Sequence, residues 1–195
     1  MKKIILTVFA ASSLLLYSTP SFAIVSVSVG MPMGQTITGK QGGKSFGNVP
    51  DKTGGYFLGV SFLSIGLGID SYTTKFKTHA DGTYGKWEPK YDAGLKTNMT
   101  NIFYQLPVPV VNLIIGLGTG TTEYVGTSEG KDFSNFFDKG SATQWYASIG
   151  MPLIPFFDIH LSYRSITSKN IKHKSDGQID DNSGSVTGLG LAFNF

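Results

Sequence analysis

The sequence contains no cysteine, and only 15% of its 195 residues are charged. Without cysteine the chain has neither a disulfide framework nor a lipidated N-terminal cysteine. No segment after the N-terminus has the about 20 consecutive apolar residues that a transmembrane helix requires. The formal charge of +3 includes Lys2 and Lys3, so the basic balance is weak and does not indicate nucleic-acid binding. No cofactor is predicted.

The first 23 residues have the pattern of a secretory signal peptide. Lys2 and Lys3 precede an apolar run over residues 4–16, and the small residues Ser21 and Ala23 suit cleavage after Ala23. The apolar run is too short to cross a bilayer as a helix. A retained N-terminal anchor is the alternative. We expect residues 1–23 to be removed on export and residues 24–195 to form one domain.

Eight later segments alternate apolar and polar residues, which is the signal of half-buried β-strands. Pro32 cannot donate to a strand ladder and predicts a bulge or strand end in the first segment. The fourth segment is the least regular, so we expect a bulge there as well. The predicted strands cover residues 25–31, 56–63, 64–75, 94–106, 112–124, 142–151, 156–165 and 185–195.

The connections between these segments alternate between short and long. Short turns are predicted at residues 63–64, 107–110 and 152–155, and long polar loops at 34–55, 76–93, 125–141 and 166–184. Both ends of the domain then lie on the side of the short turns. This pattern predicts an all-β fold, an eight-stranded antiparallel up-and-down transmembrane β-barrel.

Glycines indicate which face of each strand is outside. A soluble barrel would show charged side chains on the polar face, whereas this chain shows glycines, which suit a crowded lumen. The aliphatic face then meets lipid, and aromatic residues form two girdles at the membrane interfaces. The upper girdle is predicted from Tyr56, Trp145 and Tyr163, and the girdle near the short turns from Phe62, Phe103, Phe157, Phe193 and Phe195.

The last predicted strand alternates strictly and closes on Phe193 and Phe195. It resembles the C-terminal strand of bacterial outer-membrane barrels, which the barrel-assembly machinery reads as its signal. With the loop pattern, the chain resembles the small barrels of the OmpA membrane-domain and OmpX/Ail type. The resemblance implies an outer-membrane location, contact with lipid and lipopolysaccharide, and a structural or surface-interaction role such as adhesion, resistance or envelope integrity.

Strand parity predicts a network of charged side chains in the lumen. Asp70 and Arg164 are expected on opposite strands, where they can meet across an interior about 15 Å wide. Because a buried charge needs a partner, we predict a plugged lumen; a narrow pore for ions or small solutes is the alternative. The predicted network consists of Asp70, Lys96, Asp158, His160 and Arg164.

One short motif raises the possibility of catalysis. His160 and Ser162 resemble the start of the His-x-Ser-Asn motif of lipid A deacylases, but Tyr163 stands where that motif has Asn. Parity also turns both side chains towards the lumen and away from acyl chains. We therefore expect no enzyme, with a deacylase-like activity through His160 and Ser162 as the alternative.

The long loops carry aromatic clusters among charged residues. Trp87, Phe133, Phe136 and Phe137 are candidate contacts for a host or matrix ligand, since exposed apolar clusters often mark interaction sites. Equally, these rings could cover the mouth of the barrel or lie in the membrane interface. The loop at 166–184 carries lysines and aspartates without the spacing of a calcium loop, and we expect it to be solvated.

Overall fold

The computed structural model describes residues 24–41, 44–45, 50–76, 92–106, 108, 111–128, 130–154 and 156–195. The predicted signal peptide therefore lies outside the described residues. Eight long strands dominate the structure, with lengths from 11 to 17 residues. They are β1 Val25–Ile37, β4 Pro50–Phe62, β5 Ile65–Phe76, β6 Asp92–Leu106, β7 Asn112–Ser128, β9 Gly140–Ile154, β10 Phe157–Lys169 and β13 Gly184–Asn194.

The eight strands form a closed ring. Each pairs antiparallel with its neighbours in the order β6-β5-β4-β1-β13-β10-β9-β7, and a further β6–β7 pairing joins the two ends. A closed ring leaves no unpaired edge, which a barrel surrounded by lipid requires. The predicted eight-stranded up-and-down barrel is confirmed.

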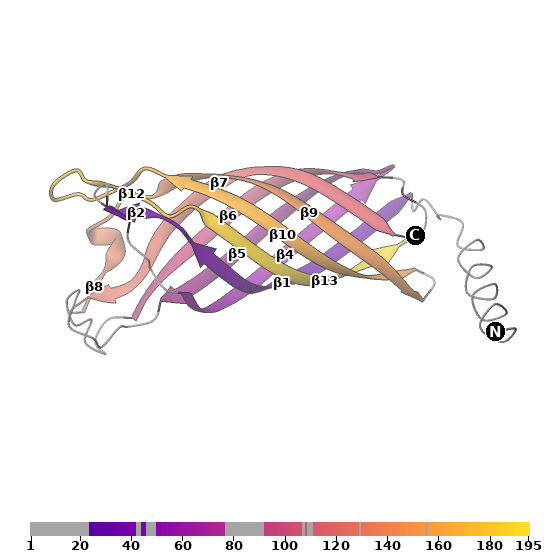
Figure 1. The fold of residues 1–195 in the computed structure, drawn as a ribbon, viewed down its shortest axis with the longest axis horizontal. Coiled ribbons are helices and arrows are strands. Elements are labelled where there is room, and N and C mark those ends of the chain that lie inside the picture. The colour runs from indigo at the N-terminus through magenta and orange to yellow at the C-terminus, as the bar shows by residue number, and fades with distance from the viewer. Residues whose placement is uncertain are drawn as a thin grey trace, which may run out of the picture.

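The short connections and the C-terminus lie at one end of the barrel, opposite the long connections (Figure 1). The hairpin between β4 and β5 turns on Leu63 and Ser64, whose φ angles of 46° and 74° suit the mirror-image turn of two-residue hairpins. A membrane-spanning strand needs only about 9–11 residues. The barrel is therefore longer than a bilayer requires and extends beyond it on the side of the long connections.

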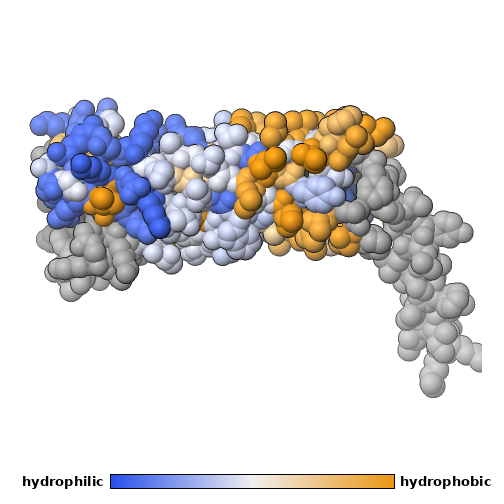
Figure 2. Space-filling model, turned by 90° about the horizontal axis from the view of Figure 1, so that it is seen from above, coloured by the Kyte–Doolittle hydropathy of each residue, from blue (hydrophilic) through white to orange (hydrophobic). Residues whose placement is uncertain are grey.

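The two faces of each strand differ as the alternation predicted. On β13 the outward Leu189 and Leu191 are exposed, whereas Val186 and Ala192 are buried in the lumen. Figure 2 shows that the exposed apolar side chains gather in a band at the short-turn end, followed by a pale zone and then a hydrophilic end. Among the described residues, no helix is long and apolar enough to span a membrane.

Strand β6 differs from the prediction. Its register is uninterrupted against both β5 and β7, so the expected bulge is wrong. Leu95, Met99 and Phe103 are all buried in the lumen, which also removes Phe103 from the predicted aromatic girdle. The physical reason is space: Phe103 pairs with Gly66 on one side and Gly116 on the other, and a side chain added at Gly66 would collide with its ring.

Irregularities occur at two other places. The register of β1 against β13 shifts between Pro32 and Gly34, which confirms the bulge predicted at Pro32. Strand β9 continues through Pro152 to Ile154, and its register against β10 shifts between Phe157 and Asp158. The turn predicted at 152–155 is therefore shorter than expected, because a bulge accommodates Pro152 within the strand end.

The long connections build structure of their own above the barrel. A second sheet, in the order β11-β12-β2-β3, joins segments of the first and last connections. The third connection adds a short hairpin strand and a 3-10 helix. We call this assembly the cap. It comprises residues 171–181, which include β11 and β12, residues 130–138, and the backbone of β2. The bounds are β2 Lys40–Gln41, β3 Lys44–Ser45, β8 Lys131–Asp132, η1 Phe133–Asn135, β11 Ile171–Lys172 and β12 Ile179–Asp181.

Candidate functional sites in the lumen and the cap

An ion pair crosses the middle of the lumen. Nε of Arg164 on β10 donates to Oδ2 of Asp70 on β5 at 3.1 Å, and both residues are buried. These strands lie four steps apart in the ring of eight, on opposite sides. Two polar neighbours hydrogen-bond to the pair: Nη1 of Arg164 donates to Oγ of Ser162 at 2.5 Å, and Nε2 of Gln144 donates to Asp70 at 2.6 Å.

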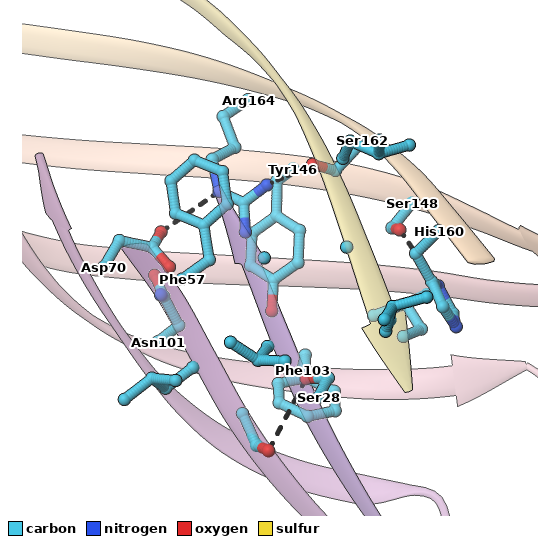
Figure 3. Close-up of a pocket in the computed structure, with 18 residues that line it drawn as sticks. Ser28, Phe57, Asp70, Asn101, Phe103, Tyr146, Ser148, His160, Ser162 and Arg164 are labelled. Atoms are coloured by element: carbon cyan, nitrogen blue, oxygen red, sulfur yellow. Dashed lines mark hydrogen bonds and ion pairs between the residues drawn. The ribbon is translucent and has the colours of Figure 1, made fainter. Parts of the chain in front are cut away.

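Aromatic rings enclose the guanidinium of Arg164 (Figure 3). Its central carbon lies 3.6 Å from the centroid of the Phe57 ring and 4.7 Å from that of Tyr146. Phe57 in turn meets Tyr72 edge to face at 5.9 Å between ring centroids. A desolvated cation over an aromatic face is stabilised by roughly 2 kcal/mol or more. Arg164 is therefore fixed by charge, hydrogen bonding and ring contacts together.

A second polar cluster lies nearer the short-turn end of the lumen. Asp158 on β10 accepts hydrogen bonds from the side-chain amides of Asn112 and Asn194, the latter at 2.7 Å. Nε2 of His160 lies 3.8 Å from the same carboxylate oxygen, too far for a hydrogen bond. Nδ1 of His160 lies 3.2 Å from Oγ of Ser148 on the neighbouring strand β9.

The structure thus pairs His160 with a serine other than the one in the sequence motif. Ser162 donates to the carbonyl of Gly188 at 3.3 Å and accepts from Arg164. The His160 ring lies over Gly150, where an added Cβ would collide with it. The sequence signal for this contact is Gly150, which lies directly opposite His160 on the neighbouring strand. A glycine there leaves room for the histidine ring to lean towards β9, which the pattern of β10 alone does not indicate.

A cavity of about 60 Å³ separates the two polar clusters. Ser28, Gly59, Phe103, Ser148 and His160 are among the residues that line it. A site for one water needs at least about 10–15 Å³, so a few water molecules fit. The lining mixes polar side chains such as Ser148 and His160 with the rings of Phe57 and Phe103, so the polar groups are the ones that bound water could reach.

Lys96 is the one member of the predicted network that lies elsewhere. Its neighbours Leu95 and Thr97 are both buried in the lumen, so Lys96 points outward and the prediction that it faces the lumen is wrong. The error follows from assigning the apolar residues of β6 to lipid. Lys96 pairs in register with Thr73 and Glu123 near the loop end.

The cap shares a small apolar core with the mouth of the barrel. Ile37, Leu95 and Ile171 are buried, and Phe76, Tyr124 and Phe137 pack against them. Phe133 is also buried, with its ring 5.9 Å from that of Phe137. The prediction of exposed aromatic contacts is therefore wrong for Phe133, Phe137 is half-buried, Phe136 is 41% exposed, and Trp87 lies outside the described residues.

A buried carboxylate ties the cap to the barrel. Asp180 on β12 is only 1% exposed. It accepts a hydrogen bond from the Tyr124 hydroxyl of β7 at 3.1 Å and lies 3.1 Å from Nε2 of His173. The expectation of a solvated loop at 166–184 is wrong at this residue, because strand pairing with β11 and β2 turns Asp180 inward.

The residues of the predicted assembly signal lie at the opposite end of the barrel. The ring of Phe193 meets that of Phe157 at 4.5 Å between centroids. Phe195 is 69% exposed, and its backbone N–H donates to the carbonyl of Val25 at 2.9 Å. Both rings therefore lie at the end of the barrel that carries the apolar band.

Comparison with known proteins identifies the architecture. No protein-family model matches the chain, and no curated protein matches it in sequence. Solved structures do match: the Neisserial surface protein A is 14% identical with a TM-score of 0.61, covering 88% of this chain and 97% of that one. The outer membrane protein W of E. coli is 10% identical with a TM-score of 0.51, covering 91% and 100%.

The chain has the fold of the small eight-stranded outer-membrane barrels. The Ail protein of Yersinia pestis also matches, at 16% identity and a TM-score of 0.45, covering 88% of this chain and 97% of that one. The apolar band on the outer face indicates where the barrel lies, since closed barrels with such a band are typical of the outer membrane. This outer-membrane barrel therefore turns its aliphatic face to lipid.

Proposed function

We propose that this outer-membrane barrel has a structural and surface-interaction role, in which the cap presents a binding surface to an extracellular ligand such as a host or matrix component. The observation that carries the proposal is the interlocking of three connections over one end of the barrel. Binding surfaces are commonly built from loops on a rigid scaffold. A cap held by its own sheet and by a core shared with the barrel is such a surface.

Backbone hydrogen bonds support the rigidity of the cap. Strand β12 pairs with β11 on one side and β2 on the other. The segment around Phe137 pairs with the outer edge of β11: the N–H of Asp138 donates to the carbonyl of Lys172, and that of Lys174 to Phe136, each at 2.9 Å. A ligand would meet preorganised groups, which lowers the entropic cost of binding.

The outer side of the cap offers an aromatic residue among cations. Phe136 is exposed, and Lys174 lies beside it, with Nζ donating to the carbonyl of Ser134 at 2.7 Å and 3.7 Å from the carboxylate of Asp138. Lys131 and Lys172 are also exposed. Aromatic residues are favoured anchors of interfaces, so we assign the contact surface to Phe136 and these lysines, with Trp87 of the second connection as a further candidate.

We propose further that the lumen does not conduct. The Arg164–Asp70 pair, the flanking rings and the Asp158 cluster occupy an interior that in eight-stranded barrels has room only for side chains. In planar bilayers we expect negligible conductance from the wild-type protein. A stable open channel of porin size would contradict the plugged lumen without affecting the cap.

A deacylase role is not favoured. His160, Ser148 and Ser162 are all buried in the lumen, whereas an acyl chain of the outer leaflet approaches from the lipid side. The proposed partners are instead membrane lipid including lipopolysaccharide, the barrel-assembly machinery and the extracellular ligand.

The experiment is an attachment assay on cells that express full-length variants. We expect Phe136→Ser combined with Lys174→Gln to reduce attachment to host cells or matrix severalfold at equal surface expression, with Trp87→Ser tested beside it. The matched control is Phe156→Ser, an exposed aromatic at the opposite end, which should leave attachment unchanged. Undiminished attachment by every cap variant would refute the proposed binding surface.

A further inference from the structure

The outer face of the barrel carries a belt of Ser and Thr hydroxyl groups directly above the apolar band, on every long strand except β4. On β7 the outward positions run Leu117, Thr119, Thr121 and then Glu123. The same succession of apolar residue, two hydroxyls and charge recurs on β5 and β10. Of the positions assigned to the belt, Thr36, Thr100, Thr119, Thr121, Ser141, Thr143, Thr167 and Thr187 are exposed, and Ser71, Thr73, Ser165 and Ser185 are half-exposed.

Register shows that the belt is a surface and not a scatter of residues. Thr100 pairs with Thr119, Thr119 with Thr143, and Thr143 with Thr167, a row that crosses four neighbouring strands. In Figure 2 the pale zone between the apolar band and the hydrophilic end occupies this level. A row of aligned β-branched hydroxyls presents donors and acceptors at the regular strand spacing of about 4.8 Å.

The dimensions place this belt outside the hydrocarbon. Exposed apolar residues on β1 extend from Val25 to Met33, which at about 3.3 Å per residue and a tilt near 40° is about 20 Å of height. With the reach of the side chains, this approaches the apolar band of about 25 Å expected of outer-membrane barrels. The belt adds about 10 Å by the same geometry, more than the roughly 5–8 Å headgroup layer of a phospholipid bilayer.

Charged side chains lie above the hydroxyl belt and not within it. Among the described residues of the belt, no side chain is charged. Cations follow immediately above it at Lys75, Lys96, Lys139 and Lys169, with the acidic Glu123 held by Lys139 at 2.8 Å. From the membrane outwards the barrel therefore offers apolar side chains, neutral hydroxyls and then a mainly basic ring.

We propose that the hydroxyl belt binds the sugar headgroups of an anionic glycolipid of the outer leaflet, of the lipopolysaccharide class. Acyl chains meet the apolar band, sugar hydroxyls exchange hydrogen bonds with the threonine row, and acidic groups of the glycolipid meet the basic ring. A phospholipid headgroup is too thin to fill the belt and has few hydroxyls. This inference rests on the outer-membrane placement of the barrel and is independent of the ligand proposed for the cap.

The test replaces the hydroxyls without changing shape. Thr100, Thr119, Thr143 and Thr167 are changed together to Val, which is isosteric and equally suited to strands. Full-length protein is refolded into liposomes of phosphatidylethanolamine and phosphatidylglycerol, alone or with rough lipopolysaccharide or a neutral digalactosyl lipid. We expect both glycolipids to raise the urea midpoint of the wild type, and the Val variant to lose about 1 M of that increase, as about four ordinary hydrogen bonds would supply.

A variant of the basic ring separates the sugar from the charge. Lys96→Gln combined with Lys169→Gln should reduce the increase caused by lipopolysaccharide and leave that caused by the digalactosyl lipid. The control is Val27→Thr combined with Val60→Thr in the apolar band, which should lower the midpoint equally in all three membranes.

Three results would overturn the proposal. Equal midpoint increases in wild type and Val variant would mean that only water faces the belt. Stabilisation of the Val variant in every membrane would mean that the belt lies in hydrocarbon. An increase with lipopolysaccharide and none with the digalactosyl lipid would mean that charge and not sugar is recognised.

Discussion

Arg164 on β10 and Asp70 on β5 meet across the full width of the barrel, with Nε of the guanidinium 3.1 Å from a carboxylate oxygen. Both side chains are shielded from solvent, and the Phe57 ring covers the guanidinium. Charges removed from water in this way depend on each other, because either one left alone keeps its desolvation cost without compensation. The pair therefore links opposite walls of the cylinder.

Removing one member of this pair should destabilise the barrel strongly. We expect Arg164→Ala to lower the free energy of unfolding by about 3–5 kcal/mol, since Asp70 is then buried without its partner. Urea unfolding in lipid, followed by Trp fluorescence, measures the change. The double variant Arg164→Met, Asp70→Leu should recover most of the loss, because two apolar residues leave no buried charge. Wild-type stability of Arg164→Ala would mean that the pair contributes nothing.

Strand glycines should be replaceable only where no large side chain lies against them, as the lumen-facing Gly116 and the exposed Gly54 show. A Cβ added at Gly116 collides with the Tyr146 ring, whereas nothing lies within 4 Å of one added at Gly54. We expect Gly116→Ala to cost about 1–3 kcal/mol of stability through overpacking and Gly54→Ala to be neutral. In a Tyr146→Ala background, the penalty for Gly116→Ala should disappear. An unchanged penalty there would show that Tyr146 is not the obstacle.

The buried carboxylate of the cap should control local and not global stability. Asp180→Ala removes the acceptor of the Tyr124 hydroxyl and the partner of His173, at a local cost of about 1–3 kcal/mol. Limited trypsin digestion should then cut faster at Lys172 and Lys174, while the unfolding midpoint of the barrel stays within error. Asp176→Ala, an exposed aspartate of the same hairpin, is the control. Equal cleavage of both variants would contradict the anchoring role of Asp180.

Lipid A composition separates a binding protein from an enzyme. We expect mass spectra of lipid A to be the same with and without the protein, because Ser148, His160 and Ser162 all face the lumen. Ser148→Ala and His160→Ala should change neither the spectra nor attachment to host cells. An acyl chain that is lost only when Ser148 or Ser162 is intact would establish catalysis after all.

Much of the barrel follows from the sequence because alternation has a period of two and each face has one environment. Strands β10 and β13 show this directly. Leu161 and Leu189 lie on the face exposed to lipid, and Arg164 lies on the face buried in the lumen. The opposed positions of Asp70 and Arg164 follow from the same parity and the number of strands.

Only the tertiary structure decided which face of an irregular strand points into the lumen, because alternation by itself does not distinguish the two faces. On β6 Phe103 lies in the lumen between Gly66 and Gly116, and Met99 lies there beside Gly120. This space is a relationship between strands that one strand cannot reveal. The outward position of Lys96 is the consequence. The partnership of His160 with Ser148 depends in the same way on a neighbouring strand.

The cap is the clearest case of structure that local sequence does not encode. Its sheet joins β2 with β12, segments that stand about 140 positions apart along the chain, and their short polar sequences have no periodicity to indicate pairing. Asp180 is buried within this sheet, and Phe133 is buried in the third connection beside Phe137. The sequence by itself determined the cylinder and its two faces, whereas long-range pairing decided which loop residues are buried, because their burial depends on partners distant in the chain.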